Sequence, residues 1–337
     1  MPQDSSARTV LVTGAAGYVG ATVVARLLEA GRPVRALDSL LFGDGALSSL
    51  AAGKNGTPLE FVAADVRDAD SVRAATRGVD AVVHLARLVG DPACALDPAL
   101  TRAINVDGTA RVAEAAAEAG VRRLVFASTC SVYGAAGEGW LDEESATAPV
   151  SLYAETHLEA EALLRERLRG TGTEVTLLRF ATVFGLAPRM RFDLVVNLLT
   201  AKALREGAIE VHGGEQWRPQ VHVDDVAQAI LLAIDHPRAA SATFNVGADD
   251  LNLRISELGS RIAARFPDVR LTVSPTRDPR SYRVSFARIE RELGFRARHR
   301  LEEGIDEIAA WLGERPALDH RAARYSNVLA LEETLRP

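Results

Sequence analysis

A glycine-rich loop near the N-terminus has the spacing of a phosphate-binding turn. After the apolar run Thr9–Val12, residues 13–20 read Thr-Gly-Ala-Ala-Gly-Tyr-Val-Gly and include Gly14, Gly17, Tyr18, Val19 and Gly20. Glycines permit a tight turn and let backbone N–H groups approach a pyrophosphate, which the positive end of the following helix stabilises. A glycine-rich turn that binds nothing has the same spacing, so the loop alone leaves both interpretations open.

The acidic residue Asp38 favours the first interpretation. It follows the apolar run Pro33–Leu37 and lies about 18 residues beyond Gly20. A carboxylate at the end of the second strand can accept hydrogen bonds from both hydroxyls of a ribose, and it repels a 2′-phosphate. The loop and Asp38 together predict a site for NAD rather than NADP, although an aspartate at a strand end can also be a simple turn residue.

Hydroxyl, thiol, phenol and imidazole groups lie in two further segments. The apolar run Leu124–Ala127 leads into Ser-Thr-Cys-Ser at residues 128–131, and Tyr153 and His157 are four residues apart in a segment of helical periodicity. Because residues four apart lie on one face of a helix, these two side chains project in the same direction. Hydroxyl groups at a strand end that face a tyrosine could take part in proton transfer.

Short apolar runs alternate with amphipathic, alanine-rich segments over the first half of the chain. The runs are Thr9–Val12, Pro33–Leu37, Leu59–Ala63, Ala81–Leu85, Leu124–Ala127 and Glu174–Leu178. Apolar runs of this length between helical segments are typical of buried parallel strands with helical crossovers. The sequence therefore predicts an α/β fold with a Rossmann-type doubly wound parallel sheet.

The alternation ends after about Gly185. Helical patterns follow near Phe192–Arg205, Val223–Ile234, Ile255–Phe266 and Leu301–Leu312, with short strands between them. We expect residues 1–185 to form an NAD-binding Rossmann domain, with contributions from about residues 220–248. Residues 186–337 should form mainly a smaller C-terminal α+β substrate lobe.

Composition limits the function classes. With 337 residues, 47% of them apolar, the chain can form a cofactor domain and a smaller lobe. The net charge of −6 argues against nucleic acid as a partner. Cys94 and Cys130 lack the spacing of a disulfide framework or a zinc site, and no metal is predicted. The polar start and the lack of a run of ~20 apolar residues predict a cytoplasmic protein without a membrane anchor.

Taken together, these motifs resemble the extended short-chain dehydrogenase/reductase family, which contains the NAD-dependent nucleotide-sugar epimerases and dehydratases. The resemblance covers roughly residues 9–295 and is carried by the glycine spacing, Asp38, Asp65-Val66, His84-Leu85-Ala86 and Asn105-Val106-Asp107-Gly108-Thr109. It implies that Asp65 and Val66 flank adenine, that Leu85 and Ala86 lie beside the nicotinamide half of NAD, and that Asn105 belongs to the cofactor site.

The resemblance also assigns catalytic roles. Thr129 matches the catalytic Ser/Thr, and Tyr153 matches the tyrosine that removes a proton from a sugar hydroxyl while hydride passes to NAD. In the family a lysine four residues after this tyrosine binds the nicotinamide ribose and lowers the tyrosine pKa, but here the residue is His157. A neutral imidazole can bind a ribose but supplies no permanent charge. Either His157 does part of the lysine's work, or the protein binds NAD with little turnover.

The two residues after Thr129 distinguish the subclasses. By resemblance, sugar 4,6-dehydratases carry an acid pair there, whereas this chain has Cys130 and Ser131, which disfavours simple dehydration. The Cys130 thiol, with an ordinary pKa near ~8.5, could transfer a proton at a carbon beside a ketone. The alternative is that Cys130 is a small buried apolar residue.

Arginines are expected to bind the substrate. Arg218 and Arg280 resemble the family's two arginines that bind the sugar-nucleotide diphosphate, which suits the bidentate geometry of guanidinium. Asn197 could also touch the diphosphate, and Thr129 and Ser131 are expected to contact the sugar. Relatives place an asparagine where this chain has Thr182, so the identity of the sugar does not carry over.

The leading hypothesis is an NAD-dependent epimerase that acts on a nucleotide-diphosphate sugar through a transient keto intermediate, most simply at C4. One alternative is a ketoreductase or a dehydratase-like enzyme with Cys130 as acid or base. Another is a weakly catalytic NAD-binding or sensor protein, because His157 replaces lysine. The segments Leu100–Ala119 and Ser151–Leu168 are rich in Ala and Leu on more than one face, and the resemblance implies that the equivalent helices pair two chains, so a homodimer is expected. A helix that is fully buried within one chain would show the same pattern.

Overall fold

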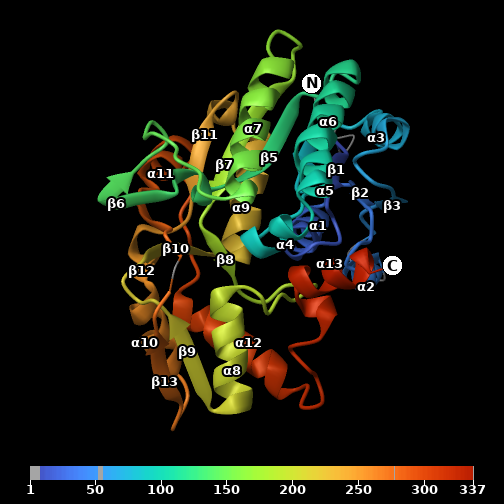
Figure 1. The fold of residues 1–337 in the computed structure, drawn as a ribbon. Helices are drawn as coiled ribbons and strands as arrows, with labels where there is room; N and C mark the ends of the chain where they lie inside the picture. The colour runs from blue at the N-terminus through green and yellow to red at the C-terminus, as the bar shows by residue number, and fades with distance from the viewer. Residues whose placement is uncertain (1–7, 52–55, 277, 337) are drawn as a thin grey trace.

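In the computed structural model, which describes residues 8–51, 56–276 and 278–336, seven parallel strands form the central sheet (Figure 1). In spatial order they are β11 (Thr243–Val246), β7 (Glu174–Phe180), β5 (Arg123–Thr129), β4 (Ala81–His84), β1 (Val10–Thr13), β2 (Val34–Asp38) and β3 (Leu59–Ala63). Each of the six predicted apolar runs forms one of these strands. The strand order reverses between β1 and β4, which opens a crevice at the carboxyl ends of the sheet. The predicted Rossmann-type sheet is confirmed.

Helices cover both faces of the sheet. One face carries α1 (Tyr18–Glu29) and α9 (Val223–Asp235), and the other carries α3 (Ala69–Thr76), α6 (Thr109–Glu118) and α7 (Leu152–Arg167) (Figure 1). Successive strand residues point to opposite faces, so Val10 and Val12 pack with the α1 and α9 core while Leu11 packs with the α6 and α7 core. Burial on both faces explains why these strands are continuously apolar.

A smaller lobe lies beyond the carboxyl ends of the strands. It contains the sheet of β8 (Thr182–Phe184), β10 (Trp217–His222) and β12 (Asn252–Arg254), and the parallel pair β9 (Ala208–His212) and β13 (Arg270–Ser274). The helices α8 (Val195–Glu206), α10 (Ile255–Ala263) and α12 (Leu301–Gly313) enclose its apolar core. The four helices predicted after Gly185 are therefore α8, α9, α10 and α12, although α10 ends three residues earlier than the pattern suggested.

Several elements have no counterpart in the sequence prediction. They are α2 (Gly45–Ala51), α4 (Asp91–Leu96), α13 (Asn327–Leu335) and the strand pair β6 (Ala135–Leu141) and β14 (Ser281–Val284). The segment Ala287–Phe295, which resembles the family's C-terminal helix, forms α11 (Ala287–Leu293), and the segment Leu100–Ala119 begins within α5 (Pro98–Arg102) and continues through a π-helical turn (Ala103–Gly108) into α6. The C-terminal helix α13 returns to α4, where Leu331 packs against Leu88 and Cys94 (Figure 1). Both α9 and β11, which lie within residues 220–248, belong to the sheet layers. The division at residue 185 stays a prediction.

Neither the helices nor the cysteines test the predicted cytoplasmic location. Within residues 8–51, 56–276 and 278–336, every helix is too short or too polar to cross a membrane. Cys94 and Cys130 are both buried free thiols. The cytoplasmic location stays a prediction.

Candidate active site

A cavity of about 320 Å³ lies at the carboxyl ends of the strands, between the sheet and the smaller lobe. Fifteen of the residues predicted from the sequence line it: Gly14, Gly17, Tyr18, Val19, Gly20, Asp38, Asp65, Val66, Leu85, Ala86, Thr129, Ser131, Tyr153, His157 and Arg280. Four predicted residues lie outside its lining: Asn105, Cys130, Asn197 and Arg218. The fold thus brings together the glycine loop, the Thr129 segment and the tyrosine helix.

The glycine loop fits a pyrophosphate. Gly14 has φ +70°, and a Cβ there would lie 2.7 Å from the backbone nitrogen of Ala86, while a Cβ on Gly20 would lie 2.0 Å from the Gly14 oxygen. Helix α1 begins behind Gly17 without a side-chain cap, so the N–H groups of its first turn lack a side-chain acceptor. An anion at the helix end can supply that acceptor. The loop is therefore a cradle whose uncapped donors suit a dinucleotide.

Two backbone hydrogen bonds hold the carboxylate of Asp38 beside the glycine loop. Its Oδ2 accepts from the Ala16 N–H at 2.9 Å, and its Oδ1 accepts from the Leu40 N–H at 2.8 Å. Burial raises the pKa of Asp38, and the two backbone hydrogen bonds oppose that rise. Each carboxylate oxygen still has a second lone pair, so Asp38 can accept from ribose hydroxyls as the sequence predicts.

Thr129 and Tyr153 meet at the opposite end of the cavity. Thr129 ends β5, and Tyr153 lies in the first turn of α7, which the Ser151 hydroxyl caps by accepting from the Ala154 N–H at 3.3 Å. Burial raises the pKa of Tyr153 to about 12, whereas a hydrogen bond with Thr129 opposes that rise. The two hydroxyl groups can thus act on one substrate oxygen, but the phenol alone holds its proton at neutral pH.

His157 is a neutral hydrogen-bonding group. Its Nδ1 lies 2.6 Å from the Tyr153 carbonyl oxygen, and since a carbonyl only accepts, Nδ1 carries the proton. Burial, assisted by the charge of Arg87, lowers the pKa of His157 well below its usual value. In the neutral ring Nε2 keeps a free lone pair. His157 can therefore accept a hydrogen bond from a ribose hydroxyl but supplies no positive charge.

The structure argues against Cys130 as an acid or a base. The side chain is 1% exposed, packs in the core between α9 and the sheet, and donates to the Arg179 carbonyl at 3.3 Å. Burial raises the pKa of the thiol far above its usual value. The expectation of a proton-transferring thiol is wrong, because the turn after Thr129 points Cys130 into the core and Ser131 into the cavity.

Two asparagines act through the loops that they hold. Asn105 accepts from the Leu88 N–H at 2.9 Å and donates to the Leu88 carbonyl at 3.0 Å, which fixes the loop after β4. Asn197 accepts from the Gly185 N–H at 3.1 Å and donates to the Arg191 carbonyl at 2.9 Å. Both amides are fully buried and lie outside the cavity lining, so each residue shapes the wall through the loop that it holds. Direct contact of Asn105 with NAD and of Asn197 with the diphosphate stays a prediction.

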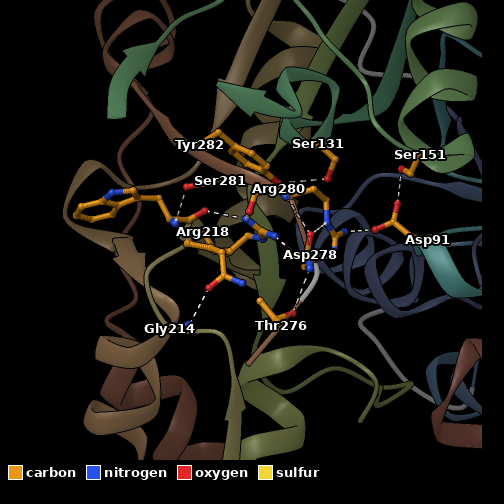
Figure 2. Close-up of polar contacts among 12 residues, drawn as sticks. Asp91, Ser131, Ser151, Gly214, Arg218, Thr276, Asp278, Arg280, Ser281 and Tyr282 are labelled. Carbon is orange, nitrogen blue, oxygen red and sulfur yellow. Dashed lines mark hydrogen bonds and ion pairs between the residues drawn. The ribbon is translucent and has the colours of Figure 1, made fainter. Parts of the chain in front are cut away.

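Figure 2 shows Arg218 and Arg280 converging on the carboxylate of Asp278. Their Nη2 atoms lie 2.9 Å and 2.6 Å, respectively, from the same oxygen, and Arg280 also pairs with Asp91, which accepts from the Ser151 hydroxyl. Burial opposes ionisation of Asp278, but hydrogen bonds from Arg280 and the charge of Arg218 lower its pKa to about 2. The two arginines do meet, yet only Arg280 lines the cavity, so the direct contact of Arg218 with substrate stays a prediction.

The cavity lining also includes polar residues that were not predicted, among them Arg87, Arg189, Arg191, Tyr282 and Asn327. Arg87 directly follows the His-Leu-Ala motif, so only its residue type could have pointed to it. Arg189 and Arg191 lie in a segment that the sequence marks only as a loop. Asn327 lies beyond the part of the chain covered by the resemblance.

Comparisons with known proteins agree with this geometry. A model of the NAD dependent epimerase/dehydratase family matches residues 10–247. The chain is 33% identical over 303 residues to a UDP-glucose 4-epimerase of Mycolicibacterium smegmatis, covering 88% of this chain and 95% of that protein. It is 30% identical over 324 residues to a dTDP-glucose 4,6-dehydratase of Streptomyces niveus, covering 91% and 94%.

A solved structure, MoeE5 in complex with UDP-glucuronic acid and NAD, superimposes with a TM-score of 0.80 at 30% identity and covers 91% of this chain and 99% of that one. An epimerase and a dehydratase are thus similar to this chain at nearly the same identity. The kind of reaction therefore rests on the residues at the site.

Proposed function

Because the chain belongs to the NAD-dependent epimerase/dehydratase family, we propose that it epimerises a nucleotide-diphosphate sugar through a transient keto intermediate, most simply at C4. The observation that carries the choice of reaction is the pair of residues after Thr129. Elimination of water needs an acid and a base near the sugar, whereas here the thiol of Cys130 is buried and Ser131 bonds to Tyr282 at 3.2 Å.

The carboxylates of the cavity support the same choice. Among the described lining residues they are Asp38, Asp65 and Asp91. Asp38 lies at the glycine loop, Asp65 pairs with Arg67 at 2.8 Å, and Asp91 pairs with Arg280. None of these three carboxylates forms a pair of acids beside Thr129. Dehydration would need an acid and a base that they do not supply there, so they favour epimerisation.

The glycine loop, Asp38 and His157 would hold NAD. Bound NAD would supply the hydride acceptor for oxidation of the sugar alcohol to a ketone, and the hydride donor for its reduction. Tyr153 takes the proton as the substrate O–H bond breaks, and it returns that proton when the ketone is reduced. Thr129 hydrogen-bonds to the same oxygen and keeps it aligned with the phenol.

Arg280 and the polar pair Ser131 and Tyr282 would face the nucleotide sugar. The charge of Arg280 is shared between Asp278 and Asp91, so a diphosphate must compete with Asp91 for the guanidinium. Arg218 would act behind Arg280, since it donates to the Arg280 carbonyl and stabilises Asp278. Because Arg280 lines the cavity and Arg218 lies behind it, a substitution of Arg280 should weaken substrate binding more than a substitution of Arg218.

The test is to identify the product. Purified protein is incubated in D₂O with UDP-glucose, UDP-glucuronic acid or dTDP-glucose, and the sugars are identified by NMR. The proposal predicts a 4-epimer of at least one substrate, without deuterium at C5. A 4-keto-6-deoxy product labelled at C5 would instead identify a dehydratase.

A second candidate is an NAD-binding protein with little turnover, which the neutral His157 favours. It predicts retained NAD, no product from any nucleotide sugar, and a large gain of activity in His157→Lys. Ordinary turnover by the wild-type protein would exclude it.

A further inference from the structure

Position 157 provides no cation for the catalytic tyrosine. The Nδ1–H of His157 is committed to the Tyr153 carbonyl, and the ring is neutral. Burial is the main cause that raises the pKa of Tyr153 to about 12, so the phenolate is disfavoured here and a nearby positive charge matters for its formation. The proposed reaction therefore needs a positive charge from another element.

Arg87, on the loop after β4, lies beside this pair. It is 8% exposed and lines the cavity. Its Nη2 donates to the Thr156 carbonyl at 3.0 Å, one residue before His157, and its guanidinium carbon lies 4.9 Å from the centre of the Phe126 ring. The His157 ring lies on the same phenylalanine, with ring centres 6.4 Å apart. The guanidinium is thus held by the backbone of α7 close to the tyrosine and the histidine.

Among the residues that the structure describes, none is a counter-ion for the charge of Arg87. In the part of the chain that the structure describes, the guanidinium forms no ion pair, and its Nε is buried without a hydrogen-bond partner. Glu161 is committed elsewhere, because both of its oxygens accept from Arg179, at 2.9 Å and 2.7 Å. An unpaired buried cation is unfavourable for stability. A role in the site offers a reason for its presence.

We propose that Arg87 supplies the positive charge for Tyr153 that a lysine at position 157 would supply, while His157 keeps the contact to the ribose. This inference rests on the proposed function, since it concerns proton transfer by Tyr153. Arg87 acts through the tyrosine and is therefore a positioning residue. The two tasks of one lysine are divided between two side chains on different elements.

An arginine suits this place because it stays charged. Burial lowers the pKa of Arg87 to about 10, which leaves the guanidinium protonated at neutral pH. Burial raises the pKa of Tyr153; the hydrogen bond with Thr129 opposes that rise most, and the charge of Arg87 also opposes it. Burial is the main cause that keeps His157 neutral, and the charge of Arg87 adds to it.

The other groups around this pair cannot take the same role. Asp91 and Cys94 raise the pKa of Tyr153 rather than lower it, and Thr129 is uncharged. His84 is also uncharged, because burial and the charge of Arg87 lower its pKa to about 3. Arg87 is thus the cation among the charged groups that act on Tyr153.

The test measures the electrostatic field of Arg87 without NAD or substrate. In Tyr153→Cys, the introduced thiol is titrated by its rate of alkylation against pH, and the buried Cys94 and Cys130 give a low background. Adding Arg87→Gln keeps an amide that can donate to the Thr156 carbonyl but removes the charge. We expect the thiol titration to move up by about one pH unit. Arg102→Gln is the matched control, because Arg102 is half-exposed and pairs with Glu159.

The second readout is activity with Tyr153 in place. Arg87→Gln should lower turnover at pH 7 by about 100-fold, with recovery as the pH rises, because general base catalysis is worth about that factor or more. Combining it with His157→Lys should restore activity to within about tenfold of the wild type. His157→Lys alone should gain nothing, since it places a second cation beside Arg87.

Three results would overturn the inference. They are a thiol titration that Arg87→Gln leaves in place, an activity loss in Arg87→Gln that does not vary with pH, and a large gain of activity in His157→Lys alone. If Arg87→Gln does not fold, the activity of His157→Lys alone still tests the inference. A wild-type protein that makes no epimer while the titration still moves would defeat the proposed function but not the electrostatic role.

Discussion

Tyr153 is the residue on which the proposed chemistry depends most directly. Tyr153→Phe removes the proton acceptor but leaves the packing of the ring on His157, whose ring centre lies 4.4 Å away. We predict a fall in turnover of about 10²- to 10⁴-fold with unchanged NAD content, measured by product NMR and by mass spectrometry of the denatured protein. Thr129→Ala should have a smaller effect of the same kind. Wild-type rates in both variants would show that the assigned roles are wrong.

Cys130 should be dispensable for chemistry. Cys130→Ala leaves the cavity lining intact and removes only a buried thiol that donates to the Arg179 carbonyl. We predict turnover within about twofold of the wild type and a loss of unfolding free energy of about 1 kcal/mol. Turnover and denaturant melts of the variant test this prediction, and a large fall in turnover without a change in stability would return the thiol to the mechanism.

Buried neutral histidines should make the fold sensitive to acid. Burial lowers the pKa of His84 to about 3 and that of His157 well below the ordinary 6.5, so below pH 6.5 the unfolded chain binds protons that the folded chain does not. Each histidine should therefore cost about 1 kcal/mol of stability between pH 7 and pH 5.5. Urea unfolding at the two pH values checks this prediction. His157→Gln should show the smaller pH dependence, and an equal dependence would contradict a neutral His157.

At the scale of residues, the positions of residues with a characteristic spacing were predictable, but the directions of the side chains were not. The glycines, Asp38 and Tyr153 lie where their spacing indicated, because each stands at a strand end or on one helix face. The direction of Cys130 depends on the turn after β5, which no periodicity encodes. Arg87 carries no spacing signal, and its meaning appears only when α7 is packed against the loop after β4.

At the scale of elements, the β1–α1 turn should tolerate no side chain at Gly20. A Cβ there would lie 2.0 Å from the Gly14 oxygen, so Gly20→Ala must displace the loop that faces the pyrophosphate. We predict loss of co-purified NAD, measured in the denatured protein by mass spectrometry. Gly313→Ala is the matched control, because nothing lies within 4 Å of a Cβ at the end of α12. Equal NAD content in both variants would contradict the role of the loop.

The elements themselves were partly predictable. Six strands of the sheet and four later helices follow from apolar runs and helical periodicity, because their burial is imposed by one or two faces of a sheet. The short helices α2 and α4 were missed, since six or seven residues give too little periodicity. The return of α13 to α4 is a long-range contact of Leu331 with Leu88 and Cys94, which a local pattern cannot contain.

At the scale of the whole molecule, we predict a homodimer through the outer faces of α6 and α7, which lie side by side (Figure 1). Light scattering after size exclusion should give about twice the mass of one 36.1 kDa chain. Ala162 is exposed on α7, so Ala162→Arg should produce monomers. A monomeric wild type, or a dimer unaffected by Ala162→Arg, would place any interface elsewhere.

The whole molecule joins a dinucleotide cradle, a tyrosine helix and a substrate lobe around one cavity. In the proposed reaction, hydride leaves one sugar carbon and returns to the same carbon. The most direct test uses UDP-glucose deuterated at C4, with no added cofactor. The account predicts a 4-epimer that retains the deuterium at C4, since the hydride stays within the site between its removal and its return. Loss of that deuterium from the epimer, or a product that keeps a ketone, would contradict it.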